Sequence, residues 1–284
     1  MRRLDLLKAK YPRQSQVING SLFEYRYHQN KHSDVTFVLL TGALGPSDLF
    51  LFHFDEFAKS YSVILFDYPT ACPTNQELSD AIAQLLRTLH VKAYLVGQSL
   101  GGFIAQIVAK QHPDAVEGMI LSNTGTLLTD MDNEGTECLL DMLKQIDKFI
   151  VLMKILPFGI VKQLMKKAVL SYVKSEYGTD IMGEFIDEMM SSITKKHELH
   201  VNYLLKDMKN YWNMEKTDFA QYDNRVLLAL SDDDPTFNDS VKQALISIVP
   251  NPVVVTNIRG GHLALFLNMD DYIKAVKDFI DQKY

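Results

Sequence analysis

The stretch YLVGQSLGGF, residues 94–103, places Ser99 two residues after Gly97 and two before Gly101. The apolar run AYLV just before it predicts a buried strand, and the spacing of apolar residues just after it predicts a helix. A serine on a sharp turn between a strand and a helix is typical of an enzymatic nucleophile. The G-x-S-x-G pattern alone would arise by chance in about one chain in ten of this length. The surrounding sequence must therefore decide its meaning.

Short apolar segments and helical patterns alternate on both sides of this turn. Because the apolar segments have no polar face, they are typical of strands buried inside a parallel sheet. Their alternation with helices predicts an α/β fold with a mostly parallel, doubly wound sheet. FEYRYH (23–28) alternates aromatic and polar residues and predicts an antiparallel edge strand with one wet face. The predicted parallel strands are VTFVLL (35–40), SVILF (62–66), AYLV (93–96), GMIL (118–121), VLLAL (226–230) and PVVVT (252–256).

Two of the predicted helices have clear sequence signals. Thr74 and Glu77 form an S/T-x-x-E start signal ahead of an apolar stripe that runs from Leu78 to Leu89. The last helix carries apolar residues at helical spacing from Tyr272 to Ile280. We expect both helices to pack against the sheet.

The strand–helix alternation stops between about residues 126 and 220. This stretch is rich in helical patterns, and nine of the twelve methionines lie between Thr126 and Asp223. A helical cap or lid inserted before the last two strands explains the interruption, and helices that only pad the core are the alternative. We expect residues 1–125 and 221–284 to form the core and 126–220 the cap.

Composition limits the remaining classes of protein. The chain has 284 residues, 47% of them hydrophobic, and a formal net charge of −6. Its basic residues are interspersed with acidic ones, whereas a nucleic-acid binder would normally show a basic patch, which argues against nucleic-acid binding. Two cysteines without a C-x-x-C pairing suggest neither a disulfide framework nor a zinc site. The N-terminus lacks an apolar signal core, and FIVLMKILPFGIVKQLM (149–165) is broken by lysines and a proline. A soluble, cytoplasmic protein is expected.

A nucleophilic serine needs a base and a group that orients the base. His262 follows the strand PVVVT and the turn IRGG and is expected to open the last helix. The strand VLLAL ends in three aspartates, and Asp234 is the preferred acid, with Asp233 as the fallback and Asp232 also open. Asn123 ends another strand but carries no carboxylate. The order Ser99, Asp234, His262 is the nucleophile–acid–base order of α/β enzymes of this kind.

An acyl-transfer enzyme also needs amide donors for the oxyanion. One is the N–H of Leu100, which follows the serine at the start of a helix. The turn VLLTGALGPSD offers the other, where Gly42 lets the backbone turn. The Ala43 N–H is preferred and that of Leu44 is the alternative.

From about Phe23 to the C-terminus, excluding most of 126–220, the chain resembles the α/β-hydrolase fold superfamily. VGQSLGGF, LSDDDP and RGGHLALFLNMDDYIKAVKDFI match its elbow, acid-loop and histidine-loop patterns in order. The resemblance implies a serine hydrolase. It departs at Thr41-Gly42, where the superfamily usually has His-Gly, and at FDYPTACPTN, where an Arg-Gly-containing loop is frequent. DYP with SLGGF also resembles the maspardin-like members, to which a binding role is ascribed.

The expected reaction is cleavage of a small, largely apolar carboxylic ester or thioester through an acyl-enzyme, with no metal or organic cofactor. One alternative is carbon–carbon bond hydrolysis or another reaction that the same triad performs in this fold. The other is a non-catalytic ligand receptor or interaction protein. HELH (197–200) lacks the zinc-binding H-E-x-x-H spacing and predicts a solvated helix face, and His53 is expected in packing or at the surface. The expected partner is a small apolar acyl substrate, and FIVLMKILPFGIV could also contact a second subunit or rest on lipid.

Overall fold

Eight strands form one sheet in the order β1-β2-β4-β3-β5-β6-β7-β8. The computed structural model describes residues 3–43, 46–172, 186–187 and 189–283. From β4 to β8 all neighbouring strands are parallel, as the apolar runs predict. The strands are β1 Gln14–Ile18, β2 Ser21–His28, β3 Thr36–Leu40, β4 Ser62–Leu65, β5 Ala93–Gln98, β6 Val116–Ser122, β7 Val226–Ala229 and β8 Val253–Val255.

The prediction that residues 23–28 form the edge strand is wrong. β2 is antiparallel as predicted, but it pairs with β1 on one side and with β4 on the other, so β1 is the edge. Only the last of the five residues of β1, QSQVI, is buried. Its sequence therefore lacks the apolar signal that identifies the other strands.

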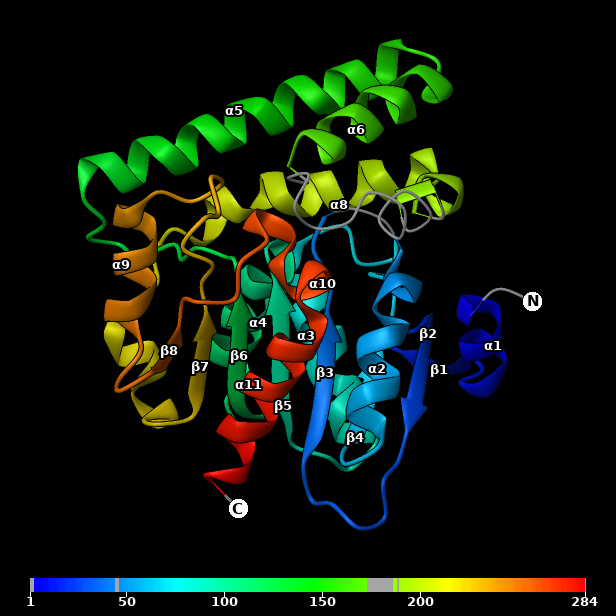
Figure 1. Ribbon diagram of the computed structural model, residues 1–284, viewed down its shortest axis with the longest axis vertical. Coiled ribbons are helices and arrows are strands. Elements are labelled where there is room, and N and C mark those ends of the chain that lie inside the picture. The colour runs from blue at the N-terminus through cyan, green and yellow to red at the C-terminus, as the bar shows by residue number, and fades with distance from the viewer. Residues whose placement is uncertain (1–2, 44–45, 173–185, 188, 284) are drawn as a thin grey trace.

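Helices cover both faces of the sheet (Figure 1). Alternate residues of β3 point to opposite faces. Val38 and Leu40 pack in one apolar cluster with α3, α4 and α9. Phe37 and Leu39 pack in the other cluster with α1, α2 and α11. The helices are α1 Arg3–Lys10, α2 Leu51–Ala58, α3 Asn75–Thr88, α4 Leu100–Gln111, α5 Asn133–Ile155, α6 Phe158–Tyr172, α8 Lys195–Asp207, α9 Asp239–Ile248, α10 Ala264–Leu267 and α11 Met269–Asp281.

Local sequence signals fix several helix ends. Thr74 caps α3, and its side chain and that of Glu77 form the reciprocal hydrogen bonds of a capping box, as predicted. The prediction that His262 opens the last helix is wrong, because His262 lies in the short 3₁₀ turn η5, Gly261–Leu263, ahead of α10 and α11. Asn268 has non-helical torsion angles (φ −124°, ψ 55°) and separates α10 from α11.

The segment between β6 and β7 crosses the carboxyl ends of the parallel strands. Figure 1 shows α8 next to the strand ends, with α5 and α6 as the layer farthest from the sheet. Two 3₁₀ turns, η3 Met208–Tyr211 and η4 Lys216–Tyr222, lead back to β7. The boundaries 126–220 for a separate cap stay a prediction. Within the described residues, no helix is long and apolar enough to cross a membrane.

The two ends of this inserted segment lie side by side. The Met214 N–H donates to the Leu127 carbonyl at 3.0 Å, and the Thr129 N–H donates to the Met214 carbonyl at 3.0 Å. Leu128 and Met214 form a parallel bridge. The chain therefore leaves and rejoins the sheet layer at one place.

Candidate active site

Ser99 lies between β5 and α4 in a backbone conformation that a side chain rarely adopts. Its φ is +51° and its ψ −116°, far from both strand and helix values. The turn is tight because strand and helix are in contact: a Cβ on Gly97 would lie 2.3 Å from the Gly101 carbonyl oxygen. A Cβ on Gly101 would lie 2.0 Å from the Leu40 carbonyl oxygen. Only glycine fits at either position, which explains the spacing around Ser99.

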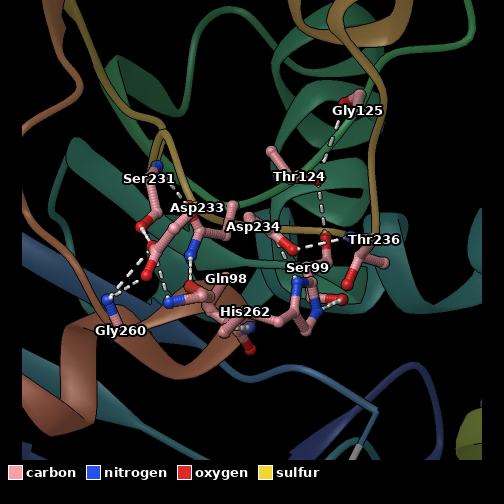
Figure 2. Close-up of polar contacts among 12 residues, drawn as sticks. Gln98, Ser99, Thr124, Gly125, Ser231, Asp233, Asp234, Thr236, Gly260 and His262 are labelled. Carbon is pink, nitrogen blue, oxygen red and sulfur yellow. Dashed lines mark hydrogen bonds and ion pairs between the residues drawn. The ribbon is translucent and has the colours of Figure 1, made fainter. Parts of the chain in front are cut away.

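The structure brings Ser99, His262 and Asp234 into one hydrogen-bonded chain (Figure 2). Ser99 Oγ lies 3.0 Å from His262 Nε2, and His262 Nδ1 lies 2.9 Å from Asp234 Oδ2. Burial alone would raise the pKa of Asp234, but the hydrogen bond and charge of His262 and the Thr236 amide outweigh it. The pKa of Asp234 therefore lies below its usual value, which keeps a carboxylate beside the imidazole.

The other two aspartates of the LSDDDP loop have different partners. Asp233 Oδ1 accepts hydrogen bonds from the Gly261 amide at 2.8 Å and from the Ser231 hydroxyl at 2.6 Å. Asp232 is half exposed and lies 3.7 Å from Arg259. The three neighbouring carboxylates thus point to three different places, and only that of Asp234 contacts His262. Asp233 instead ties the acid loop to the turn that carries His262.

Asn123 makes a second tie between the same loops. It directly follows β6 and has a φ of +40°. Its Nδ2 donates to the Gly261 carbonyl at 2.6 Å, and its Oδ1 accepts from the Ser231 amide at 2.8 Å. Its buried amide therefore joins the acid loop to the histidine loop, a role for which the sequence carries no signal beyond its place at a strand end.

Of the two predicted oxyanion donors, Leu100 follows Ser99 in the chain and Ala43 lines the same cavity. Leu100 is the first residue of α4, so its N–H has no partner within the helix. Ala43 is half-buried and lines the same cavity as Ser99, while the alternative, Leu44, lies outside the described residues. A Cβ on Gly42 would lie 2.1 Å from Gln98 Oε1, so the loop passes directly against the end of β5. The backbone of this loop thus faces the nucleophile.

Asp67 and Tyr68, which follow β4, form hydrogen bonds to the two ends of this loop. The sequence did not predict this role. Tyr68 Oη donates to the Thr41 carbonyl at 2.6 Å, and Asp67 Oδ1 accepts from the Ser47 amide at 2.6 Å. Burial would raise the pKa of Asp67, but the Ser47 amide and the Arg13 charge hold it below its usual value. Asp67 and Tyr68 belong to the stretch FDYP that departs from the superfamily pattern. The residues that replace the usual pattern therefore form hydrogen bonds to the loop that carries Ala43.

A cavity of about 480 Å³ lies above Ser99 and His262. Its wall is mostly apolar, as the cap methionines suggest, and two polar residues of α8, Glu198 and Asn202, also line it. The prediction that HELH forms a solvated face is wrong, because Glu198 and His200 are buried. α8 lies between the sheet edge and α5, so both of its sides are covered. His53 is also buried and packs against Phe266.

Comparison with known proteins supports the fold. A family model described as the alpha/beta hydrolase fold matches residues 35–150. "Putative carbamate hydrolase RutD" of Serratia proteamaculans (strain 568) is 31% identical over 98 residues, which are 31% of this chain and 37% of that relative. The chain thus spans little more than a third of the length of this curated relative.

Solved structures match over almost the whole chain. MGS-M2, an alpha/beta hydrolase enzyme from a Medee basin deep-sea metagenome library, has a TM-score of 0.74 at 16% identity, covering 94% of this chain and 97% of that one. The enol-lactonase from Burkholderia xenovorans LB400 has a TM-score of 0.71 at 16% identity, covering 94% and 100%. The chain has the α/β-hydrolase fold, and its residues 35–150 match the family model of that fold.

Proposed function

We propose that this protein is a serine hydrolase that cleaves a small, largely apolar carboxylic ester or thioester. The observation that carries the proposal is the hydrogen-bonded chain from Ser99 Oγ through His262 to Asp234 beneath a mostly apolar cavity. The lactonase among the structural neighbours supports an ester-like bond. The apolar wall favours an acyl or alcohol group with little charge.

The proposed mechanism follows from the positions of these atoms. Ser99 Oγ attacks the carbonyl carbon while His262 Nε2 takes its proton, and the imidazolium then protonates the leaving group. Asp234 holds the tautomer with the proton on Nδ1 and stabilises the charged ring. In the second half of the reaction, His262 takes a proton from water as the water attacks the acyl-enzyme. The imidazolium then returns a proton to Ser99 Oγ, and the carboxylic acid is released.

The oxyanion of each tetrahedral intermediate is assigned to the amides of Leu100 and Ala43. Donors of this type act because they are already oriented before charge develops, and each contributes about 3–4 kcal/mol to transition-state stabilisation. Tyr68 and Asp67 fix the loop that carries Ala43 by holding Thr41 and Ser47. The hydrogen bonds of FDYP thus support the second donor where the superfamily usually has His-Gly.

The test uses p-nitrophenyl esters of increasing acyl length together with a fluorophosphonate probe. The wild type should turn over esters and be labelled on Ser99, whereas Ser99→Ala should lose both, with a fall in kcat of at least about 1,000-fold. Ser240→Ala on α9 is the matched control and should keep both. Ester turnover that survives Ser99→Ala contradicts the proposal, as does a wild type that neither reacts with the probe nor cleaves any ester. Cleavage of a β-diketone but not of esters would overturn the substrate class.

A further inference from the structure

The outer side of the cap exposes large apolar side chains. We define the outer cap face by Leu140, Val151 and Ile155 of α5 and Ile160 and Leu164 of α6, each of which is exposed by more than 40%. Ile155, next to the α5–α6 connection, reaches 73%. Figure 1 shows α5 and α6 as the layer farthest from the sheet. Grouped apolar exposure of this kind marks an interaction surface more often than isolated exposed residues do.

Lysines surround this apolar face. Helices α5 and α6 together carry six lysines and four acidic residues, although the whole chain has a net charge of −6. Three carboxylates on this side pair with lysines, Asp141 with Lys144 at 2.8 Å, Asp147 with Lys206 at 2.5 Å and Asp187 with Lys166. Lys148 and Lys167 are exposed and form no ion pair with any described residue. The outer cap face therefore carries a small excess of lysines, of which Lys148 and Lys167 are exposed, on a chain that is acidic as a whole.

Helical spacing places the two kinds of side chain on the same side. Lys148, Val151 and Ile155 follow one another at steps of three and four residues along α5, and Ile160, Leu164 and Lys167 do so along α6. Apolar side chains bordered by lysines are the pattern of helices that lie in the plane of a lipid interface, with the amines near anionic headgroups. The negative charge elsewhere on the chain would be repelled by such a surface, so only this face would approach it.

The same face adjoins the cavity above Ser99. Leu164 is 46% exposed and also lines that cavity, as does Ala168 one turn further along α6. α6 also contacts the 3₁₀ turn that carries His262. A molecule that leaves a lipid layer at this face would therefore meet the cavity wall first.

We propose that the outer cap face binds reversibly to an anionic phospholipid surface, with the α5–α6 connection toward the acyl chains. The apolar side chains enter the interface, and the lysines contact the headgroups. The chain then lies on the membrane and does not span it. This inference does not require Ser99 to be catalytic.

The experiment measures co-sedimentation of the full chain with vesicles of phosphatidylcholine alone or with 30% phosphatidylglycerol. Binding is expected to the anionic vesicles and to weaken between 50 and 500 mM NaCl, because salt screens the lysines. Lys148→Gln with Lys167→Gln should weaken binding more than tenfold, since each lysine near an anionic surface contributes about fivefold. Ile155→Ser with Ile160→Ser should weaken it at least about tenfold.

Two further experiments distinguish binding through the outer cap face from non-specific hydrophobic binding and from misfolding. Val17→Ser with Leu22→Ser removes two equally exposed apolar residues from β1 and β2 and should leave binding unchanged. Ile155→Trp should give a blue-shifted indole emission that brominated lipid quenches, whereas Val17→Trp should not. Circular dichroism shows whether each variant is folded.

Four results would overturn the inference. The first is equal binding to neutral and anionic vesicles, and the second is equal loss of binding in the β1–β2 control. The third is a dimer by light scattering that Ile155→Ser with Ile160→Ser dissociates, because a second copy of the chain would then cover the face. Absence of vesicle binding by a folded monomer also overturns it, in favour of a protein partner.

Discussion

The carboxyl edge of the sheet and the helical segment above it meet at one cavity but differ in what fixes them. At the sheet edge, Ser99 has a strained φ, and its neighbouring glycines touch backbone atoms, so few residue types fit. In the cap, α5, α6 and α8 contribute side chains that could be exchanged for others of similar volume. Backbone geometry thus limits the residues at the edge, whereas in the cap the packing of side chains around the cavity sets the limit.

The largest expected difference lies within the sheet edge, between neighbouring aspartates. Asp234→Asn should lower kcat toward p-nitrophenyl butyrate by about 10⁴-fold, because an amide favours the wrong imidazole tautomer. Asp233→Asn is the control and should cost far less, since its amide oxygen can still accept from Gly261. Both variants should be checked for folding by thermal melting. If Asp233→Asn proves the more damaging to kcat in a folded protein, the assignment of the acid is wrong.

A smaller effect is expected where the sheet edge supports the oxyanion loop. Tyr68→Phe removes the hydrogen bond to the Thr41 carbonyl and should lower kcat about tenfold with little change in KM, because the loop contacts the transition state more than the ground state. Tyr222→Phe removes an equivalent bond, 2.9 Å long, to the Ala109 carbonyl, away from the site. Equal losses of kcat in both variants would show a general effect of stability and not of loop position.

In the cap, selectivity should change more than rate. Met165 lines the cavity, and Met165→Ala should shift the preference among p-nitrophenyl esters toward longer acyl chains while acetate turnover stays within about threefold. Met153 is fully buried in α5 but does not line the cavity, so Met153→Ala should lower the melting temperature without changing the chain-length profile. A profile that moves equally in both variants would mean that the cap acts through its stability.

The last prediction concerns stability in the sheet layer. Burial lowers the pKa of His53 to about 4 from its ordinary 6.5. Because the unfolded chain takes up the proton more readily, the contribution of His53 to folding is complete above pH 6.5 and is lost as the pH falls toward 4. Urea unfolding should show that acidification from pH 7 to pH 5 costs the wild type about 2 kcal/mol more than His53→Gln.

The exposed His32 provides the control for this measurement. His32→Gln should leave the acid dependence of the wild type unchanged. An acid dependence in His53→Gln that equals that of the wild type would show that the buried imidazole is not responsible.

The sequence predicts those parts of the molecule that a local pattern encodes. The parallel strands and the Thr74 cap follow from apolar runs and from one start signal. Position at a strand end also singled out Ser99, Asp234 and His262, and the structure brings these three together.

Other features depend on contacts between distant segments. β1 is too polar for its pattern to reveal a strand, and the polar run KKHELH hides the fact that Glu198 is covered from both sides. Tyr68 and Asn123 act through hydrogen bonds to the backbone of distant loops. No local sequence pattern records such bonds, so only the folded chain shows them.

The joined ends of the inserted segment have a consequence for how this protein could change. Because Leu127 and Met214 are hydrogen-bonded neighbours, the segment between them begins and ends at the same place in the fold. The entropy cost of bringing the two ends of the segment together changes only slowly with its length. A longer or shorter segment therefore need not move any strand. Replacement of the segment between Leu127 and Met214 would therefore change the cavity wall and the outer surface together, while the surroundings of Ser99 in the sheet layer stay the same.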